Sequence, residues 1–241
     1  MSAVFAVKPA VFERVPNYVV GCVLARGIDN ARSYPEIDSL LDDAEEQALL
    51  ALAGADLKEF PQVAIWRAQF SAQGWSPSRF PASVEALLKR VARGDRLPRI
   101  NPVVDLANAA VLHYLIPIGT HDVSTFGTSS LTVRYATEHD TFTPMGSDES
   151  ETPELDEVVY AVGNQVRTRR WVWRQSAQAL VGPNAVDVFF PIDGFSPETS
   201  SAVDEATRFI AAVCREQFEA QVSEGVVSAS QPEFPPERKG F

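Results

Sequence analysis

The chain has 241 residues, enough for one large α/β domain or one domain with an appended segment. Its formal net charge of −11 argues against nucleic-acid binding by the whole surface, so a nucleic-acid site would have to be a local basic island. Two isolated cysteines, Cys22 and Cys214, provide no disulfide framework and no zinc motif. Since no signal peptide or membrane-spanning run is present, we expect a soluble cytoplasmic protein without membrane partners.

The N-terminal part predicts two strands and a helix. Residues 4–7 and 18–28 are rich in β-branched side chains and predict strands. From Pro35 to Ala53 the apolar residues recur every three or four positions, which predicts an amphipathic helix with its acidic residues in solvent.

Three further helices are predicted over residues 61–73, 84–93 and 101–114. Residues 79–99 contain six cations and two acids, which is either a second basic island or a solvated helix face. Asn101, Asp105 and Asn108 follow one another at helical spacing. This polar trio could bind a ligand, or it could cap and cross-link the helix locally.

The second half of the chain predicts strands, an acidic loop and a last helix. Residues 138–157 hold eight acids and no Lys or Arg, which indicates a surface loop. A hairpin is expected from 158–162 and 165–173 around the turn Gly163-Asn164. Further strands are predicted over 132–136 and 185–192, a helix over 202–221, and a frayed tail from Ser228. We therefore expect an α+β (mixed α/β) fold with a central, mainly antiparallel sheet flanked by helices.

Residues 167–176, RTRRWVWRQS, combine four arginines with two tryptophans. Read as a strand, alternation places Arg167, Arg169, Trp171, Trp173 and Gln175 on one face. Cations beside flat rings suit a ligand with phosphates and a stackable base. The alternative is a structural strand with its tryptophans in the core and its arginines paired to nearby acids.

Catalytic and cofactor motifs give no further guidance. The chain contains no GxGxxG, GxxxxGK[ST], GxSxG or HExxH pattern. His113, His121 and His139 share no metal-ligand spacing, so we expect neither a metal nor a cofactor. His121 and Asp122 are neighbours that point to opposite faces of an extended chain, which is no evidence for a catalytic dyad.

Several blocks occur together in a fixed order: FPASVEALLKR, LPRINPVVDLANAAVLHYLIPIG, TVRYA, RRWVWRQS and NAVDVFFPIDG. In this order they resemble the B3/B4 tRNA-binding editing domain of the bacterial phenylalanyl-tRNA synthetase β subunit, and more closely the free-standing proteins that consist of that domain. The resemblance covers about residues 60–195. It implies a division into N-terminal strands and helix (1–59), an editing-like domain (60–195), and a C-terminal helix with a frayed tail (196–241).

The resemblance also implies a pocket between the helix that starts at Asn101 and the strand 167–176. The synthetase histidine falls on Gly119, two places before His121, and the synthetase glutamate falls on Arg174, so tyrosine specificity is not carried over. As candidate catalytic residues we expect Arg174 to stabilise an oxyanion, Gln175 or Asn101 to orient water, and His121 or Asp105 to act as base. The candidate substrate-binding residues are Asn108, Arg169, Arg170, Trp171, Trp173 and Ser176.

Three functions remain open at this point. The protein could hydrolyse misacylated aminoacyl-tRNA in trans, with tRNA rather than DNA as its partner. It could bind tRNA, a nucleotide or an amino-acid derivative without catalysis, or it could keep the fold without RNA binding. Pairing of Arg167, Arg169 and Arg170 with acids from 138–157 would remove the main support for RNA binding.

Overall fold

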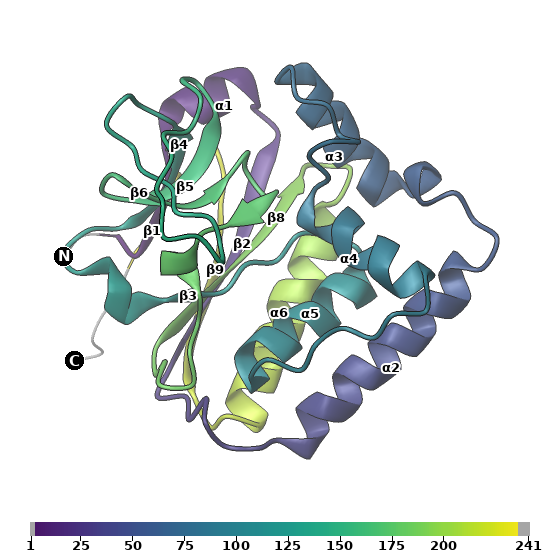
Figure 1. The fold of residues 1–241 in the computed structure, drawn as a ribbon. Coiled ribbons are helices and arrows are strands. Elements are labelled where there is room, and N and C mark those ends of the chain that lie inside the picture. Colours follow the sequence, from purple (N-terminus) through teal and green to yellow (C-terminus); the bar gives the residue numbers. More distant parts are fainter. Residues whose placement is uncertain (1–2, 236–241) are drawn as a thin grey trace.

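Two sheets form the centre of the molecule. The computed structural model describes residues 3–235, and Figure 1 shows both sheets beside a group of helices. The larger sheet has six strands in the order β10-β1-β4-β5-β6-β7. These strands are β1 (Phe5–Val7), β4 (Leu131–Tyr135), β5 (Val158–Val162), β6 (Gln165–Arg169), β7 (Arg174–Gln175) and β10 (Glu233–Phe234). All its pairs are antiparallel except β1 with β4.

The smaller sheet has four antiparallel strands in the order β3-β8-β2-β9. They are β2 (Tyr18–Arg26), β3 (His121–Asp122), β8 (Val188–Phe195) and β9 (Gln221–Val227). Every residue of β8 is buried, as its nearly continuous apolar run predicts. Strand β2, from the N-terminal part of the chain, lies between β8 and β9, which come from its C-terminal part.

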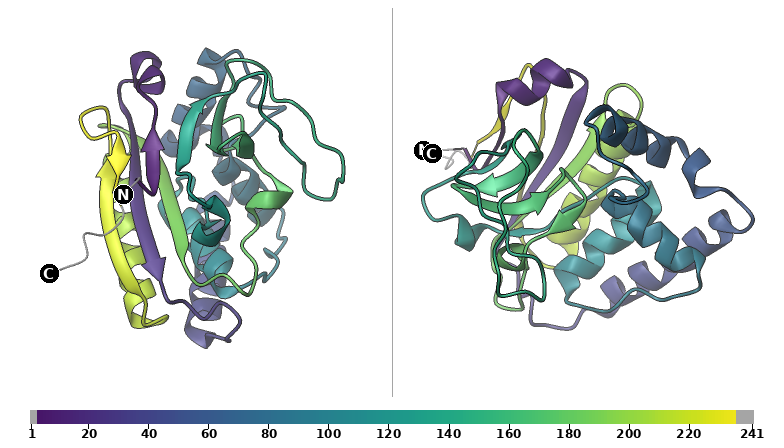
Figure 2. Two further views of the ribbon diagram at one scale, coloured as in Figure 1. Left: turned by 90° about the vertical axis from the view of Figure 1, so that its left-hand side faces the viewer. Right: turned by 45° about the horizontal axis from the view of Figure 1, so that its top comes forward.

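The longer helices lie on one side of the smaller sheet (Figures 1 and 2). α6 packs on β2 and β9, α5 packs on α6, and α2 packs on α5. The bounds are α1 (Pro9–Arg14), α2 (Pro35–Leu52), α3 (Pro61–Ala72), α4 (Ser83–Ala92), α5 (Pro102–Tyr114) and α6 (Ser200–Glu216), with short 3-10 turns η1 (Leu57–Glu59), η2 (Val123–Phe126) and η3 (Ala177–Ala179). Gly21 of β2 permits the close contact with α6, because a Cβ there would lie 2.1 Å from Thr207 Oγ1. No helix within residues 3–235 is both long and apolar enough to cross a bilayer.

An aromatic cluster joins the two sheets to α3. The ring of Trp171 lies 4.8 Å from that of Tyr18, 5.2 Å from that of Trp66 and 5.8 Å from that of Phe195. These four rings are essentially inaccessible to solvent and come from the turn after β6, from β2, from α3 and from β8. Rings at such distances and tilts stabilise a core beyond their buried area. The cluster fixes the turn after β6 against the smaller sheet.

The predicted fold class is confirmed, with three corrections. The hairpin β5–β6 forms, but β6 ends at Arg169 because Arg170 and Trp171 turn the chain with positive φ of 45° and 63°. Continuous alternation over residues 167–176 is therefore wrong. The last helix ends at Glu216, and the unpredicted strand β9 follows it.

The frayed tail is also wrong for the part of it that is described. β10 pairs with β1, so that Phe5 stands opposite Phe234. Phe234 is buried against Phe189, with 5.9 Å between the rings. This hydrophobic contact stabilises the pairing. The remainder of the predicted tail, 236–241, lies outside the described residues.

Candidate functional site

The arginines before the turn are engaged inside the protein. Arg169 donates from Nε and Nη2 to Glu157, at 3.1 and 2.9 Å, and a further guanidinium nitrogen contacts Glu151. Arg170 donates to Glu154 at 2.6 Å. Both guanidinium groups are buried and bind carboxylates of the acidic loop, so they do not form an exposed anion site.

Arg167 is buried as well, but its partners are carbonyl oxygens. It donates to the backbone oxygens of Gln178 and, at 3.0 Å, of Thr125. Arg167 thus ties η2 and η3 to β6. Two of the three arginines pair with acids of residues 138–157 and the third satisfies backbone groups, which favours the structural interpretation of this cluster.

Glu157 holds the turn itself. Its carboxylate is 1% exposed and accepts a hydrogen bond from the backbone N–H of Arg170 at 2.7 Å, in addition to those from the Arg169 side chain. Positive φ is costly for bulky residues, and this buried acceptor offsets that cost. The turn then separates the two tryptophans: Trp171 enters the aromatic core, whereas half-buried Trp173 packs edge-to-face on Phe80 at 4.8 Å.

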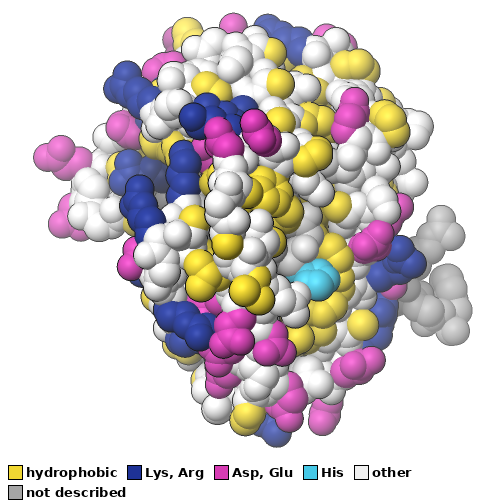
Figure 3. All heavy atoms as spheres, turned by 90° about the vertical axis from the view of Figure 1, so that its right-hand side faces the viewer, with side chains coloured by type: hydrophobic (Ala, Val, Ile, Leu, Met, Phe, Trp, Pro, Cys, Tyr) yellow, Lys and Arg dark blue, Asp and Glu magenta, His cyan; other side chains and the backbone are white. Residues whose placement is uncertain are grey.

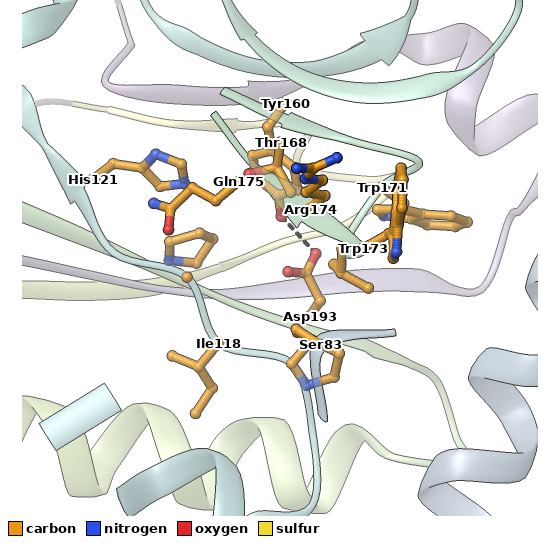
Figure 4. A pocket seen from close by; sticks show the side chains of 14 residues that line it. Ser83, Ile118, His121, Tyr160, Thr168, Trp171, Trp173, Arg174, Gln175 and Asp193 are labelled. Carbon is orange, nitrogen blue, oxygen red and sulfur yellow. Dashed lines mark hydrogen bonds between the residues drawn. The ribbon is translucent and has the colours of Figure 1, made fainter. Parts of the chain in front are cut away.

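A pocket opens beside this turn (Figure 4). One wall is formed by β6, β7 and the turn between them, and the other by β8 and the segment that leads into β3. The lining residues are mostly apolar or aromatic with a few polar groups, as in small-molecule sites. They are Ser83, Pro117, Ile118, Gly119, His121, Tyr160, Thr168, Trp171, Val172, Trp173, Arg174, Gln175, Pro191 and Asp193.

Asp193 is the most unusual residue in the pocket. Its side chain is 2% exposed, and its Oδ1 accepts hydrogen bonds from the hydroxyls of Tyr160, at 2.5 Å, and of Tyr18. Burial raises the pKa of Asp193 to about 7, against the opposing effect of the two tyrosine hydrogen bonds. Within residues 3–235 no Lys or Arg pairs with it. The second carboxylate oxygen points toward the space enclosed by the lining residues (Figure 4).

His121 stands beside this group on β3. Its ring is nearly parallel to that of Tyr160, at 15° and 5.9 Å. Burial, together with the positive charge of Arg167, lowers the pKa of His121 to about 3. The imidazole is therefore uncharged at neutral pH, and its Nδ1 has no hydrogen-bond partner within the described chain. Gly119 leaves room for the ring, since a Cβ there would lie 3.3 Å from Nε2.

Two exposed arginines, one that lines the pocket and one beside Phe80, differ from those in the buried cluster. Arg174 lines the pocket and is exposed, with its guanidinium carbon 5.9 Å from the Trp173 ring centroid. Arg79 is exposed too, 5.0 Å from the ring of Phe80. Within residues 3–235 neither has an acidic partner. The touching rings of Phe80 and Trp173 thus have two available cations beside them, in addition to the Glu154-paired guanidinium of Arg170, which lies 3.9 Å from the Phe80 ring centroid and 5.3 Å from that of Trp173. Gln175 is held by carbonyl oxygens, since its Nε2 donates to Ala179 at 2.8 Å and to Thr120 at 3.3 Å.

The polar trio on α5 serves the helix and does not line the pocket. Asn101 caps α5 by accepting from Val104 N at 3.1 Å, and its amide donates to Val181 O at 2.9 Å. Asp105 accepts from Ile100 N at 3.0 Å, and burial raises its pKa. Asn108 is half-buried on the same helix. The contacts of Asn101 with Val104 and of Asp105 with Ile100 match the local-capping alternative, and no residue of α5 lines this pocket.

Of the predicted site residues, the pocket unites Arg174, Gln175, His121, Trp171 and Trp173. Ser176 is fully buried outside the lining, and its Oγ has no hydrogen-bond partner among the described residues. No cluster of three or more potential metal ligands occurs within residues 3–235. The motifs searched in the sequence do not predict Asp193 as a site residue. The signal that could have indicated it is a single acid within the apolar run VFFPIDGF.

The second basic island is also partly neutralised. Lys89 pairs with Glu85, and Arg96 and Arg99 pair with the acids of α2. On the helical face in Figure 3, Lys and Arg gather along one side, and acidic side chains stand among them and across the rest of the face. An extended basic surface for a polyanion is therefore not present on this face.

The model of the B3/4 domain family matches residues 66–223, about two thirds of the chain. The chain belongs to the B3/4 domain family. All residues that line the pocket fall inside the matched region of this B3/4 domain, whereas Tyr18, which binds Asp193, lies outside it.

Structural comparison finds a solved structure with a limited similarity to the B3/4 domain protein described here. An N-terminal fragment of the phenylalanyl-tRNA synthetase β subunit from Pyrococcus horikoshii is 9% identical, with a TM-score of 0.47. The alignment covers 94% of this chain and 54% of that one, so this B3/4 domain protein spans about half the length of the fragment. No curated protein matches.

Proposed function

We propose that the protein binds the aminoacylated end of a tRNA and hydrolyses its ester in trans. One observation carries the proposal: Trp173, which lines the pocket, touches the ring of Phe80, and the unpaired cations Arg79 and Arg174 lie beside these two rings. An adenine can stack on such rings and phosphates can pair with the arginines. The aminoacyl group would then enter the apolar pocket, and membership of the B3/4 domain family supports this class of ligand.

The charges limit contact with the rest of the tRNA. The net charge is −11, and the buried Arg169 and Arg170 are paired with Glu151, Glu154 and Glu157. We therefore propose that recognition is confined to the terminal nucleotides. For single strands the salt slope of binding is about −0.7 per neutralised phosphate, so two arginines give about −1.4.

The proposed hydrolysis depends on positioning and electrostatic stabilisation. Arg174 is placed at the pocket rim, where it can stabilise the oxyanion that forms when water attacks the ester carbonyl. His121 can accept a hydrogen bond from this water, but with a pKa of about 3 it holds a proton poorly. We therefore expect the rate to rise with pH as hydroxide becomes available.

Deacylation of a panel of mischarged tRNAs tests the proposal. Release of an amino acid should fall at least about tenfold in Arg174→Ala, and the salt slope of binding should shrink by about 0.7 in Arg79→Ala. Arg208→Ala, which removes an exposed cation of α6 away from the pocket, is the matched control. Absence of release for every tRNA would refute deacylation, and equal loss in the control would refute the role of Arg174.

The neutralised arginines favour a second candidate, a pocket for a free amino-acid derivative without RNA binding. A 3′-aminoacyl-adenosine separates the two candidates, because it carries the ester without the tRNA body. Binding of this compound together with no binding of aminoacyl-tRNA at low salt would support the second candidate. Tighter binding of the aminoacyl-tRNA would support the first.

A further inference from the structure

The floor of the pocket contains a buried negative group without a compensating cation. Asp193 is 2% exposed, and its hydrogen bonds come from two tyrosine hydroxyls that are 3.3 Å apart. Both donate to the same oxygen, Oδ1. Within residues 3–235, Oδ2 accepts no hydrogen bond, and it points into the pocket (Figure 4). A buried carboxylate with one open oxygen is costly unless a cation or a proton meets it.

The residues around Oδ2 of Asp193 restrict which cation can bind to this oxygen. The pocket walls beside it are aromatic and apolar, from Tyr160, Trp171, Ile118 and Pro191. Arg174, at the rim, is exposed and makes no ion pair with Asp193. A small cation attached to an apolar group fits this arrangement, because the carboxylate meets the charge and the rings meet the remainder.

We propose that Asp193, oriented by Tyr18 and Tyr160, binds the primary ammonium group of the ligand. The assignment rests on the proposed function, in which the ligand is an aminoacyl group with a free α-amine. Asp193 then selects α-amino over α-hydroxy or N-acylated acyl groups, while Arg174 at the rim remains free to stabilise the oxyanion. The two tyrosines act as positioning residues, since they direct Oδ2 toward the ligand by occupying Oδ1.

A pair of small probes tests this assignment without any hydrolysis. 2-Phenylethylamine carries an ammonium on an aromatic group, and 2-phenylethanol is its neutral counterpart of similar size. Calorimetric titration at pH 8 should show the amine binding at least about 30-fold more tightly than the alcohol. Asp193→Asn should abolish this preference, whereas Asp187→Asn, a partly exposed carboxylate outside the pocket, should retain it.

The pH dependence provides a second readout. The titratable or charged groups around Asp193 are Tyr18, Tyr160, Cys22, His121 and Arg174. Burial raises the pKa of both tyrosines and of Cys22, and that of His121 is about 3, so these groups keep their charge between pH 5 and 8. Affinity for the amine should therefore rise across this range as Asp193 ionises. The rise should be absent in Asp193→Asn.

The results separate this assignment from the proposed function. Equal affinity for amine and alcohol, binding of neither, or an unchanged preference in Asp193→Asn overturns the assignment. In the deacylation assay, equal hydrolysis of α-aminoacyl and α-hydroxyacyl esters would reject ammonium recognition while leaving deacylation intact. Amine selectivity in the titration without any deacylation would reject the proposed function alone. Tyr160→Phe, which removes one donor but keeps the ring, should weaken amine binding less than Asp193→Asn.

Discussion

Replacement of Asp193 by asparagine should stabilise the folded protein at neutral and alkaline pH. The substitution keeps the shape of the side chain and an oxygen that can accept from Tyr18 and Tyr160. Its new amide group takes the place of Oδ2, which faces the pocket (Figure 4). What the substitution removes is the negative charge that burial disfavours.

The sign and the size of this stabilisation follow from the pKa of Asp193. The pKa of Asp193 is raised from 3.8 to about 7, so the folded state binds the proton more tightly than the unfolded state does. Stability from this group is therefore fully present below about pH 4 and is lost as the pH rises through 7. The difference of about 3 pH units, at 1.36 kcal/mol each, amounts to about 4 kcal/mol. Asp193→Asn should thus gain up to about 4 kcal/mol at pH 8 and almost nothing at pH 4.

Urea unfolding at a series of pH values measures this difference. Subtracting the free energies of unfolding of the two proteins at each pH cancels the titration of the other groups. Asp187→Asn serves as the control, since its partly exposed ion pair with Arg26 contributes about 1 kcal/mol or less. Parallel pH profiles for the wild type and Asp193→Asn between pH 4 and 8 would falsify the reasoning.

Two further predictions concern the turn between β6 and β7. Glu157→Gln should lower the free energy of unfolding by about 3 kcal/mol, because it leaves Arg169 buried with a weaker partner. The control Glu138→Gln, at a side chain that is 78% exposed, should change the free energy of unfolding by less than about 0.5 kcal/mol. Equal melting curves for the two variants would contradict the role of Glu157. Trp171→Ala should cost about 3–5 kcal/mol of stability. Trp173→Ala should leave most of the stability and instead weaken binding of 3′-aminoacyl-adenosine, by about 1–3 kcal/mol, and the reverse pattern would refute the assignment of the two rings.

Local patterns in the sequence predict much of the fold. The spacing of Ile37, Leu41, Ala44 and Ala48 fixes the buried face of α2, and these residues are indeed buried. The turn Gly163-Asn164 predicts the β5–β6 hairpin. Both predictions succeed because the sequence signal lies within a few residues. The ordered sequence blocks predict the B3/4 domain family, which the match over residues 66–223 confirms.

The site depends on contacts that local patterns do not contain. The turn at Arg170 is set by a buried carboxylate 13 residues earlier in the chain, so strand alternation fails there. The sequence does not decide whether the arginines of residues 167–170 bind a ligand or pair with nearby acids. Only the position of the acidic loop, residues 138–157, decides between these two alternatives. Asp193 lies in a run typical of a buried strand, and its partners Tyr18 and Tyr160 are 175 and 33 residues away. Such convergence is a property of the tertiary structure.

The position of β2 has a consequence for folding and for truncation. This strand pairs with β8 on one side and β9 on the other, so the smaller sheet closes only after residues 221–227 have been synthesised. Such pairings have high contact order and predict slow formation of this sheet. A protein shortened to residues 66–223 would lack the middle strand, and Asp193 would lose its Tyr18 donor. The pocket floor is thus assembled from strands that are far apart in the chain, and its acidic group has its observed partners only when β2, β5 and β8 are all in place.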